Sequence, residues 1–217
     1  MLPFKGTVPA ETTGGTNAYY TNYAANDGTA HVGLGQWWLK SDDGNSIIRG
    51  YRAVAEGSQA WMSYSTYQQP GNANQDRVIM YGLQQNDYWQ MEIPTLGIAA
   101  GTSLRIETHM QASGTGPGYF LFQYSTDKNT WTNINPQTDG SITYTIKMLN
   151  AATAPFSETF TIASAIPKGM FYIRLLVNSS TSANGGATLG TGGTSWVTRP
   201  VYTDDTNKIP IMKVSKL

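Results

Sequence analysis

The stretches YWQMEIP, residues 88–94, and LRIETHM, residues 104–110, decide the fold of this chain. In the first stretch, apolar Trp89, Met91 and Ile93 alternate with polar residues, and the second stretch repeats this alternation. A period of two residues is that of a β-strand with one buried and one solvent-facing side. Each stretch therefore predicts a strand in a half-buried sheet.

The same criteria predict strands elsewhere, over residues 35–39, 46–51, 59–67, 76–81, 119–124, 141–147, 159–162, 171–177, 195–199 and 209–214. The first two of these flank an Asp43-Gly44 turn, which favours a β-hairpin because glycine readily adopts the positive φ of a tight turn. The segment 171–177 is apolar on nearly both faces, which is typical of a central strand.

This spacing of short strands predicts an all-β chain. Helix formers and the i, i+4 ion pairs of exposed helices are scarce, so helical crossovers are not expected. We expect a two-sheet antiparallel β-sandwich of the jelly-roll type, as in galactose-binding domains and carbohydrate-binding modules. Residues 1–30 are expected to form an N-terminal arm and residues 31–217 a single sandwich domain, because no linker or internal repeat divides them.

The composition excludes several function classes. Charged residues make up 13% of the chain, against about 25% in an average protein, and the formal net charge is zero. Without a basic stripe, a nucleic acid is not an expected partner. The longest apolar stretch is interrupted by Arg174 and is too short to span a bilayer, and residues 1–6 lack the apolar core of an export signal. The neutral polar surface favours an extracellular or cell-surface location.

Several segments of the middle of the chain carry a resemblance to a known family. The run DYWQMEIP (87–94), the Gly-Pro turn at 116–117 and the segment QYSTDKNTW (123–131) resemble the middle of jelly-roll domains in secreted and cell-surface proteins of gut commensal bacteria. The resemblance covers about residues 87–217 and consists mostly of turn and core residues. Where many relatives carry an Asp pair in the last strand, this chain has Pro210 and Met212, so no role of those acids is carried over.

What the resemblance implies is an exported surface module, often attached to glycan-handling machinery, with no catalytic residues supplied. The residues of the chain likewise show no pattern expected of a catalytic site. A retaining glycosidase needs two carboxylates about 5 Å apart, and the nearest approach to this is a hypothetical cluster of Glu92 and Glu107, with Arg105 and His109, should their strands pair. A solvated sheet face with ion pairs is the favoured interpretation of that cluster.

Neither histidine is spaced with acids as a metal-ligand set, and no cofactor is expected. Structural calcium is an open alternative at residues 41–45 and 203–207, where Asp and Asn side chains cluster, although turns explain both segments more simply.

Aromatic residues supply the candidate ligand site. Sugar rings stack on Trp and Tyr while neighbouring polar groups bond the hydroxyls. Trp38 is expected on an outer strand face, Tyr67 borders a loop, and Trp196 follows a long polar loop with Arg199 nearby, so these four are the predicted ligand-binding residues. Trp89 and Trp131 are predicted to lie in the core.

The sequence leaves three functions open. The first is a non-catalytic module that binds a poly- or oligosaccharide through exposed aromatics. The second is a structural or adhesion domain that packs against a neighbouring surface protein or subunit through an apolar patch or an open sheet edge. The third, and least favoured, is a glycan-active hydrolase that uses Glu92 or Glu107.

Overall fold

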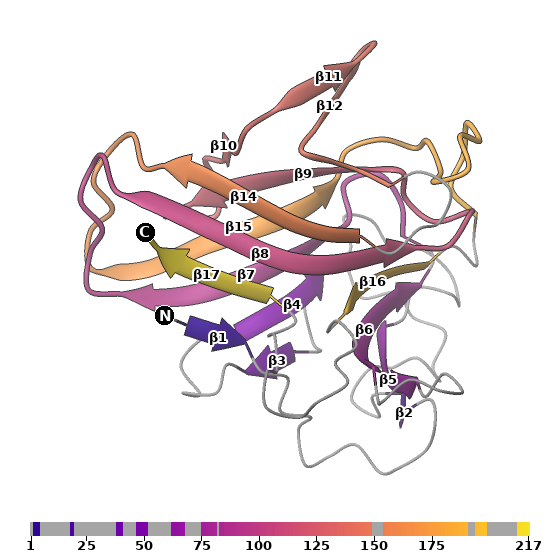
Figure 1. Cartoon of the computed structure of the whole chain (residues 1–217), viewed down its shortest axis with the longest axis horizontal. Helices are drawn as coiled ribbons and strands as arrows, with labels where there is room; N and C mark the ends of the chain where they lie inside the picture. Colours follow the sequence, from indigo (N-terminus) through magenta and orange to yellow (C-terminus); the bar gives the residue numbers. More distant parts are fainter. Residues whose placement is uncertain are drawn as a thin grey trace.

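The computed structural model describes residues 2–4, 18–19, 38–40, 47–51, 62–67, 75–81, 83–148, 154–190, 194–198 and 212–217. Within these ranges the regular elements are all β-strands, and none is a helix. The strands form two large antiparallel sheets and one small hairpin (Figure 1). The predicted all-β, two-sheet antiparallel sandwich is therefore confirmed.

The larger sheet, called sheet I here, has eight strands in the described part of the chain. Along its main path lie β1 (Leu2–Phe4), β17 (Met212–Lys216), β8 (Ser103–Ala112), β16 (Thr194–Thr198), β6 (Gln75–Tyr81), β5 (Met62–Tyr67) and β2 (Ala18–Tyr19). Strand β14 (Ala154–Thr161) pairs with β8 along its other edge. The two ends of the chain meet in this sheet, because β1 pairs with β17 (Figure 1).

The second sheet, called sheet II, has seven strands in the same ranges. They run in the order β10 (Thr132–Asn133), β9 (Tyr119–Ser125), β15 (Gly169–Val177), β7 (Tyr88–Thr95), β4 (Ile47–Tyr51) and β3 (Trp38–Lys40), with β13 (Ile146–Lys147) also on β9. Strands β11 (Gln137–Asp139) and β12 (Ile142–Tyr144) form a separate hairpin that projects from the sandwich (Figure 1).

The long strands alternate between the sheets as the chain proceeds. Strand β7 lies in sheet II, β8 in sheet I and β9 in sheet II; β14, β15 and β16 then repeat the alternation. Each crossing brings a new strand beside one laid down much earlier, so β15 pairs with both β7 and β9. This winding between two layers is the jelly-roll arrangement, and it confirms the central position predicted for residues 171–177.

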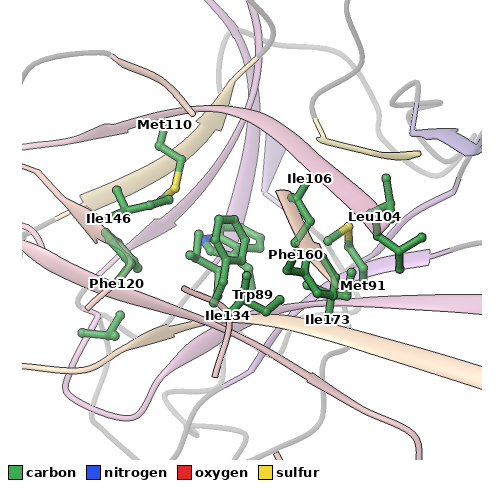
Figure 2. Close-up of a cluster of buried hydrophobic side chains, with 14 of the residues drawn as sticks. Trp89, Met91, Leu104, Ile106, Met110, Phe120, Ile134, Ile146, Phe160 and Ile173 are labelled. Carbon is green, nitrogen blue, oxygen red and sulfur yellow. The ribbon is translucent and has the colours of Figure 1, made fainter. Parts of the chain in front are cut away.

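The core lies between the two sheets. Ile106 and Phe160 come from sheet I, and Met91 and Ile173 come from sheet II, and their side chains meet in one cluster (Figure 2). Trp89 is 1% exposed and lies in the same core, as predicted. Full burial of a large apolar side chain contributes about 1.5–3 kcal/mol to the free energy of unfolding. The apolar residues of the two deciding stretches therefore stabilise the sandwich through their burial between the sheets.

A buried threonine closes the outer edge of sheet II. β10 and β13 both pair with β9, and Thr145 lies between them. Its Oγ1 accepts a hydrogen bond from the backbone N–H of Phe122 at 3.1 Å and donates one to the carbonyl of Ile134 at 2.8 Å. A side chain thus replaces a missing backbone partner. The single strand predicted over 141–147 is wrong for this reason, since Thr145 divides it into β12 and β13.

The polar loop before β16 is held by backbone hydrogen bonds to the loop before β9. The N–H groups of Ala183, Asn184 and Gly190 donate to the carbonyls of Gly116, Gly114 and Thr115 at 2.8–3.0 Å. Gly118 allows the close approach, because a Cβ atom there would lie 2.7 Å from the carbonyl oxygen of Ser182. The Gly-rich composition of both loops therefore has a packing reason.

The predicted hairpin at residues 35–51 is confirmed by the antiparallel register of β3 and β4, while its turn lies outside the described residues. Strands β1 and β2 stand in sheet I, and the division into an arm and one sandwich stays a prediction. The structure describes no helix long and apolar enough to cross a membrane.

Candidate functional site

A row of polar residues crosses the outer face of sheet II. In register across six strands, residues stand directly opposite one another, and directly paired residues point to the same side of a sheet. The row consists of Trp38, Arg49, Gln90, Arg174, Gln123 and Asn133. We call it the cross-sheet row. Its described side chains, those of Gln90, Arg174, Gln123 and Asn133, alternate with buried core residues, so they lie on the side of sheet II away from sheet I.

The described side chains of this row are joined by hydrogen bonds. Arg174 Nε donates to Gln123 Oε1 at 2.7 Å, and Gln123 Nε2 donates to Asn133 Oδ1 at 2.7 Å. Gln90 is 1% exposed although it faces outward, and its Nε2 donates to Glu92 Oε1 at 3.2 Å. Buried amides with bonded ends hold a fixed orientation. The row is therefore an ordered surface, with Arg174 at its centre.

Trp131 borders the row and packs on its arginine. The Arg174 guanidinium carbon lies 4.0 Å from the centroid of the Trp131 ring and 5.2 Å from that of Tyr88. Trp131 Nε1 donates to the carbonyl of Lys128 at 3.0 Å, which fixes the ring from its other end. The indole is half-buried rather than enclosed. A held, partly open tryptophan beside a planar cation is thus the central feature of the face.

The turn from Ser125 to Thr130 positions Trp131. Asp127 Oδ1 accepts hydrogen bonds from the N–H groups of Asn129 and Thr130, both at 2.8 Å, and from the Ser125 hydroxyl at 2.9 Å. These bonds, led by that of Thr130, hold the pKa of Asp127 below its usual value of 3.8. Lys128 adopts the left-handed region with φ 64°, and this places its carbonyl where Trp131 uses it.

A second pair of contacts lies beside the row. Lys128 Nζ lies 3.3 Å from Glu92 Oε1 and 4.6 Å from the centroid of the Tyr172 ring. Tyr172 stands opposite Glu92 in register, two positions along both strands from the Arg174–Gln90 pair of the cross-sheet row. The carboxylate of Glu92 is therefore already engaged by a lysine and an amide. Its charge is balanced within the face.

Burial affects the two groups packed on one another at the centre. It lowers the pKa of Arg174 below its usual range, and it raises the pKa of Tyr88 above its usual 10.0, with the nearby Arg174 opposing that rise. Both shifts leave arginine charged and tyrosine neutral at neutral pH. The face thus presents a partly desolvated cation between two aromatic rings.

The β11–β12 hairpin is anchored by a separate cluster. Tyr119 Oη donates to Asp139 Oδ2 at 2.7 Å, and Lys147 Nζ forms an ion pair with the same oxygen. The hydrogen bond to Asp139 raises the pKa of the Tyr119 phenol, and that from Lys147 lowers the pKa of Asp139. Tyr119 also packs edge-on against Tyr144, with ring centroids 5.4 Å apart. These contacts explain how the hairpin is fixed; they bring no second carboxylate to the row.

The four predicted ligand residues fall on different parts of the fold. Trp38 is the terminal member of the cross-sheet row by register, opposite Arg49. Tyr67 stands opposite Gln75, and Trp196 opposite Ile79 and Gln111, so both belong to sheet I. The side chains of these three and all of Arg199 lie outside what the structure describes. Their roles in binding stay predictions.

Two expectations from the sequence are wrong. Trp131 was expected in the core, but it lies on the outer face, because the alternation through Asn133 continues outward from the turn. Glu92 and Glu107 do not share a face, because β7 belongs to sheet II and β8 to sheet I. Glu107 instead stands opposite Ser157 and Lys213.

Among the described residues, no group of three or more His, Asp or Glu side chains is arranged to hold a metal ion. The two segments considered for calcium, 41–45 and 203–207, lie outside these residues.

Sequence reasoning missed Gln90, Gln123 and Arg174 as site residues. Each stands between two apolar or aromatic residues of its strand, in YWQMEIP, YFLFQYS and FYIRLLV. This repeated interruption is a signal that was present in the sequence. It becomes a site only when β7, β15 and β9 are known to be neighbours.

Comparison with known proteins gives weak similarities. No protein-family model matches the sequence, and no curated protein matches it. Solved structures with similar folds include a CBM4 module (TM-score 0.39, 13% identity, covering 71% of this chain and 78% of that one). They also include TmCBM61 in complex with β-1,4-galactotriose (0.38, 9%, 79% and 88%). A third is the CBM22-1 xylan-binding domain of Paenibacillus barcinonensis Xyn10C (0.39, 5%, 87% and 91%). Similarity at this level assigns neither a family nor a ligand to the chain.

Proposed function

We propose that this chain is a non-catalytic carbohydrate-binding module whose sugar-binding surface is the outer face of sheet II. The observation that carries the proposal is the held Trp131 ring beside the hydrogen-bonded residues Arg174, Gln123 and Asn133. Sugar recognition needs an aromatic face for the C–H groups and planar donors and acceptors for the hydroxyls. This face supplies both within one row.

Preorganisation supports binding at this face. The indole is fixed by its bond to Lys128, and the turn that presents it is stapled by Asp127. A ligand therefore does not have to pay the entropy of ordering these groups, which otherwise costs about 0.5–1.5 kcal/mol for each mobile side chain. Tyr172 and Tyr88 extend the aromatic character along the neighbouring strands.

The arrangement of acids supports a non-catalytic role. Glycoside hydrolysis needs one carboxyl group as an acid and a second as a nucleophile or base. Glu92 is bound by Lys128 and Gln90, and Asp127 accepts three hydrogen bonds within its turn. Both carboxylates have structural partners that hold them in place.

We further propose that the module works outside the cell or at its surface, with a poly- or oligosaccharide as its partner. The support for this is the composition, in which charged residues are few and neutral polar residues cover a β-sandwich.

The experiment that tests the function is affinity electrophoresis in gels that contain soluble polysaccharides of different backbones. We expect retardation by at least one polysaccharide, lost in Trp131→Ala and largely kept in Trp131→Phe, which preserves an aromatic ring. Leu96→Ala is the matched control, because Leu96 is an 89% exposed apolar residue beyond the end of β7. Mobility unchanged in every gel, or equal retardation of wild type and Trp131→Ala, would overturn the proposal.

One observation favours the adhesion alternative. Leu96 and Met170 are large apolar residues that the structure exposes, and Met170 stands opposite Pro94 near the same end of sheet II. If this end docks onto another protein or a second copy, Leu96→Asp should change the oligomeric state by light scattering. A monomer at every concentration tested for both forms would exclude self-association through it.

A further inference from the structure

Arg174 is a half-buried cation that has no acidic partner among the described residues. The ion pairs of those residues are Lys128 with Glu92 and Lys147 with Asp139. Arg174 instead donates through Nε to the neutral oxygen of Gln123 and packs between the rings of Trp131 and Tyr88. Its two terminal NH₂ groups have no hydrogen bond within the described structure.

Such a placement is costly unless an anion completes it. Burial disfavours the charged guanidinium, as its lowered pKa reflects, and ring stacking offsets only part of this cost. Arginines at buried positions are normally matched by a carboxylate or a phosphate, which their planar fork bonds through two parallel N–H groups. Here one edge of the fork is fixed by Gln123, and the terminal edge is left for a ligand.

The described residues of the rest of the face do not supply that anion. Glu92, the described carboxylate on the neighbouring pair of the same sheet, is bound to Lys128 and Gln90. Asp127 is turned into its own backbone. With Glu92 balanced by Lys128, the described part of the face carries the uncompensated charge of Arg174. An acidic ligand would neutralise it.

We propose that the terminal NH₂ groups of Arg174 bind an oxyanion substituent of an acidic glycan, a uronic-acid carboxylate or a sulfate ester, whose sugar ring packs at Trp131. This inference rests on the carbohydrate-binding function proposed above and names its substrate class. The Gln123 hydrogen bond and the contacts with Trp131 and Tyr88 hold the guanidinium in place, so its planar fork can select an oxyanion and not merely a negative charge.

The first test changes the ligand and leaves the protein untouched. Polygalacturonate, alginate and glucuronan are each compared with their carboxyl-reduced forms by calorimetry and affinity electrophoresis, and dextran sulfate is compared with dextran. We expect the anionic member of at least one pair to bind roughly 10- to 100-fold more tightly, as for a charge-assisted hydrogen-bonded pair. The uronate pairs and the sulfate pair distinguish the two sources of the oxyanion.

The second test changes the arginine. Arg174→Gln should remove most of the preference for the anionic member, and Arg174→Lys, which keeps the charge but not the fork, should restore only part of it. Arg105→Gln is the matched control, because it removes the same charge from the outer face of sheet I. If Arg174→Gln does not fold, the comparison of charged and neutral ligands with the wild-type protein still tests the preference for an oxyanion.

The outcomes separate the two proposals. Equal affinity for charged and neutral members, with both lost in Trp131→Ala, overturns the inference about Arg174 and keeps the carbohydrate-binding function. Equal loss in Arg105→Gln and Arg174→Gln also overturns it, since net charge would then explain the effect. Binding to neither member of any pair, nor to the wider set of polysaccharides, overturns both proposals.

Discussion

The outer faces of the two sheets carry similar residue types but are built differently. On sheet I, Arg105 and Glu107 of β8 stand opposite Thr159 and Ser157 of β14, whose side chains are exposed. On sheet II, Arg174 stands opposite two glutamines, one in each neighbouring strand, and both glutamines are buried. Arg105 and Glu107 are half-buried beside short hydroxyl partners of β14, whereas the half-buried Arg174 stands between two buried amides, one of which accepts a hydrogen bond from its Nε.

This difference shows that the neighbours of a polar residue decide whether it belongs to a solvated face or to an ordered site. Arg105 stands between buried Leu104 and Ile106, and Arg174 stands between buried Ile173 and Leu175, so neither the residue type nor the alternation separates the two arginines. β14 brings hydroxyls to β8, while β7 and β9 bring amides and, through the turn after β9, an indole to β15.

Thr145→Val should have the largest effect on stability. The change keeps the shape of the side chain but leaves the Phe122 N–H and the Ile134 carbonyl without their partner inside sheet II. An unsatisfied buried polar group costs about 1–3 kcal/mol, so a loss of roughly 2–5 kcal/mol in the free energy of unfolding is expected. Chemical denaturation measures it. Thr143→Val, at a half-buried position in the neighbouring hairpin, is the control and should change stability little.

Gln123→Met should come next. It removes the acceptor of Arg174 Nε and the donor to Asn133 while keeping the length of the side chain. We expect a loss of about 1–3 kcal/mol in unfolding free energy, together with weaker glycan binding. Ser157→Ala on sheet I should stay within about 0.5 kcal/mol of wild type. Equal effects of the two substitutions would show that the contrast between the faces has no energetic basis.

Glu92→Gln and Glu107→Gln form a matched pair across the sheets with a smaller expected effect. Glu92 forms an ion pair with a partly exposed lysine, for which a contribution of about 0–1 kcal/mol is typical. Losing its charge should leave Arg174 more attractive to anions and tighten binding to an acidic glycan slightly. Glu107→Gln should leave affinity unchanged. If Glu107→Gln changes the affinity for an acidic glycan as much as Glu92→Gln does, the binding site is not confined to sheet II.

The smallest effect concerns acid pH. Because the folded pKa of Asp127 lies below its usual 3.8, the carboxylate stabilises the turn above that value, and this stabilisation is lost as the pH falls through the folded pKa. Affinity should therefore be insensitive to this group between about pH 5 and 8, and should fall only at pH values below 3.8. The Asp127→Asn variant should bind the glycan more weakly than wild type near neutral pH. Its affinity should also decrease less than that of wild type when the pH is lowered, because it has no carboxylate to protonate at this position. Parallel pH profiles for both proteins would contradict the role of the turn.

Much of the architecture follows from local patterns. The strands over residues 88–94 and 104–110, the antiparallel pairing of β3 with β4, and the central strand β15 are each predicted from local sequence and are present in the structure. These predictions succeed because side-chain direction in a strand depends only on the parity of its position, which the sequence states directly. Burial of Trp89, Ile106 and Phe122 follows from the same parity.

The position of Trp131 could not be predicted from the local sequence pattern. Its outward position depends on the left-handed Lys128 and on the hydrogen bonds of Asp127, and nothing in an isolated tryptophan after a turn distinguishes outward from inward. The hypothetical Glu92–Glu107 cluster fails for a related reason. Two strands adjacent in sequence were assumed to be adjacent in space, whereas a jelly roll sends them to opposite layers.

By itself, the sequence determined that the chain is built from short strands with one apolar side, and which residues of each strand meet in the core. The tertiary structure alone decided which polar residues share a face, because that depends on strand order, and strand order depends on contacts between distant segments. Gln90, Gln123 and Arg174 are separated by 84 positions along the chain and stand side by side only because β15 inserts between β7 and β9.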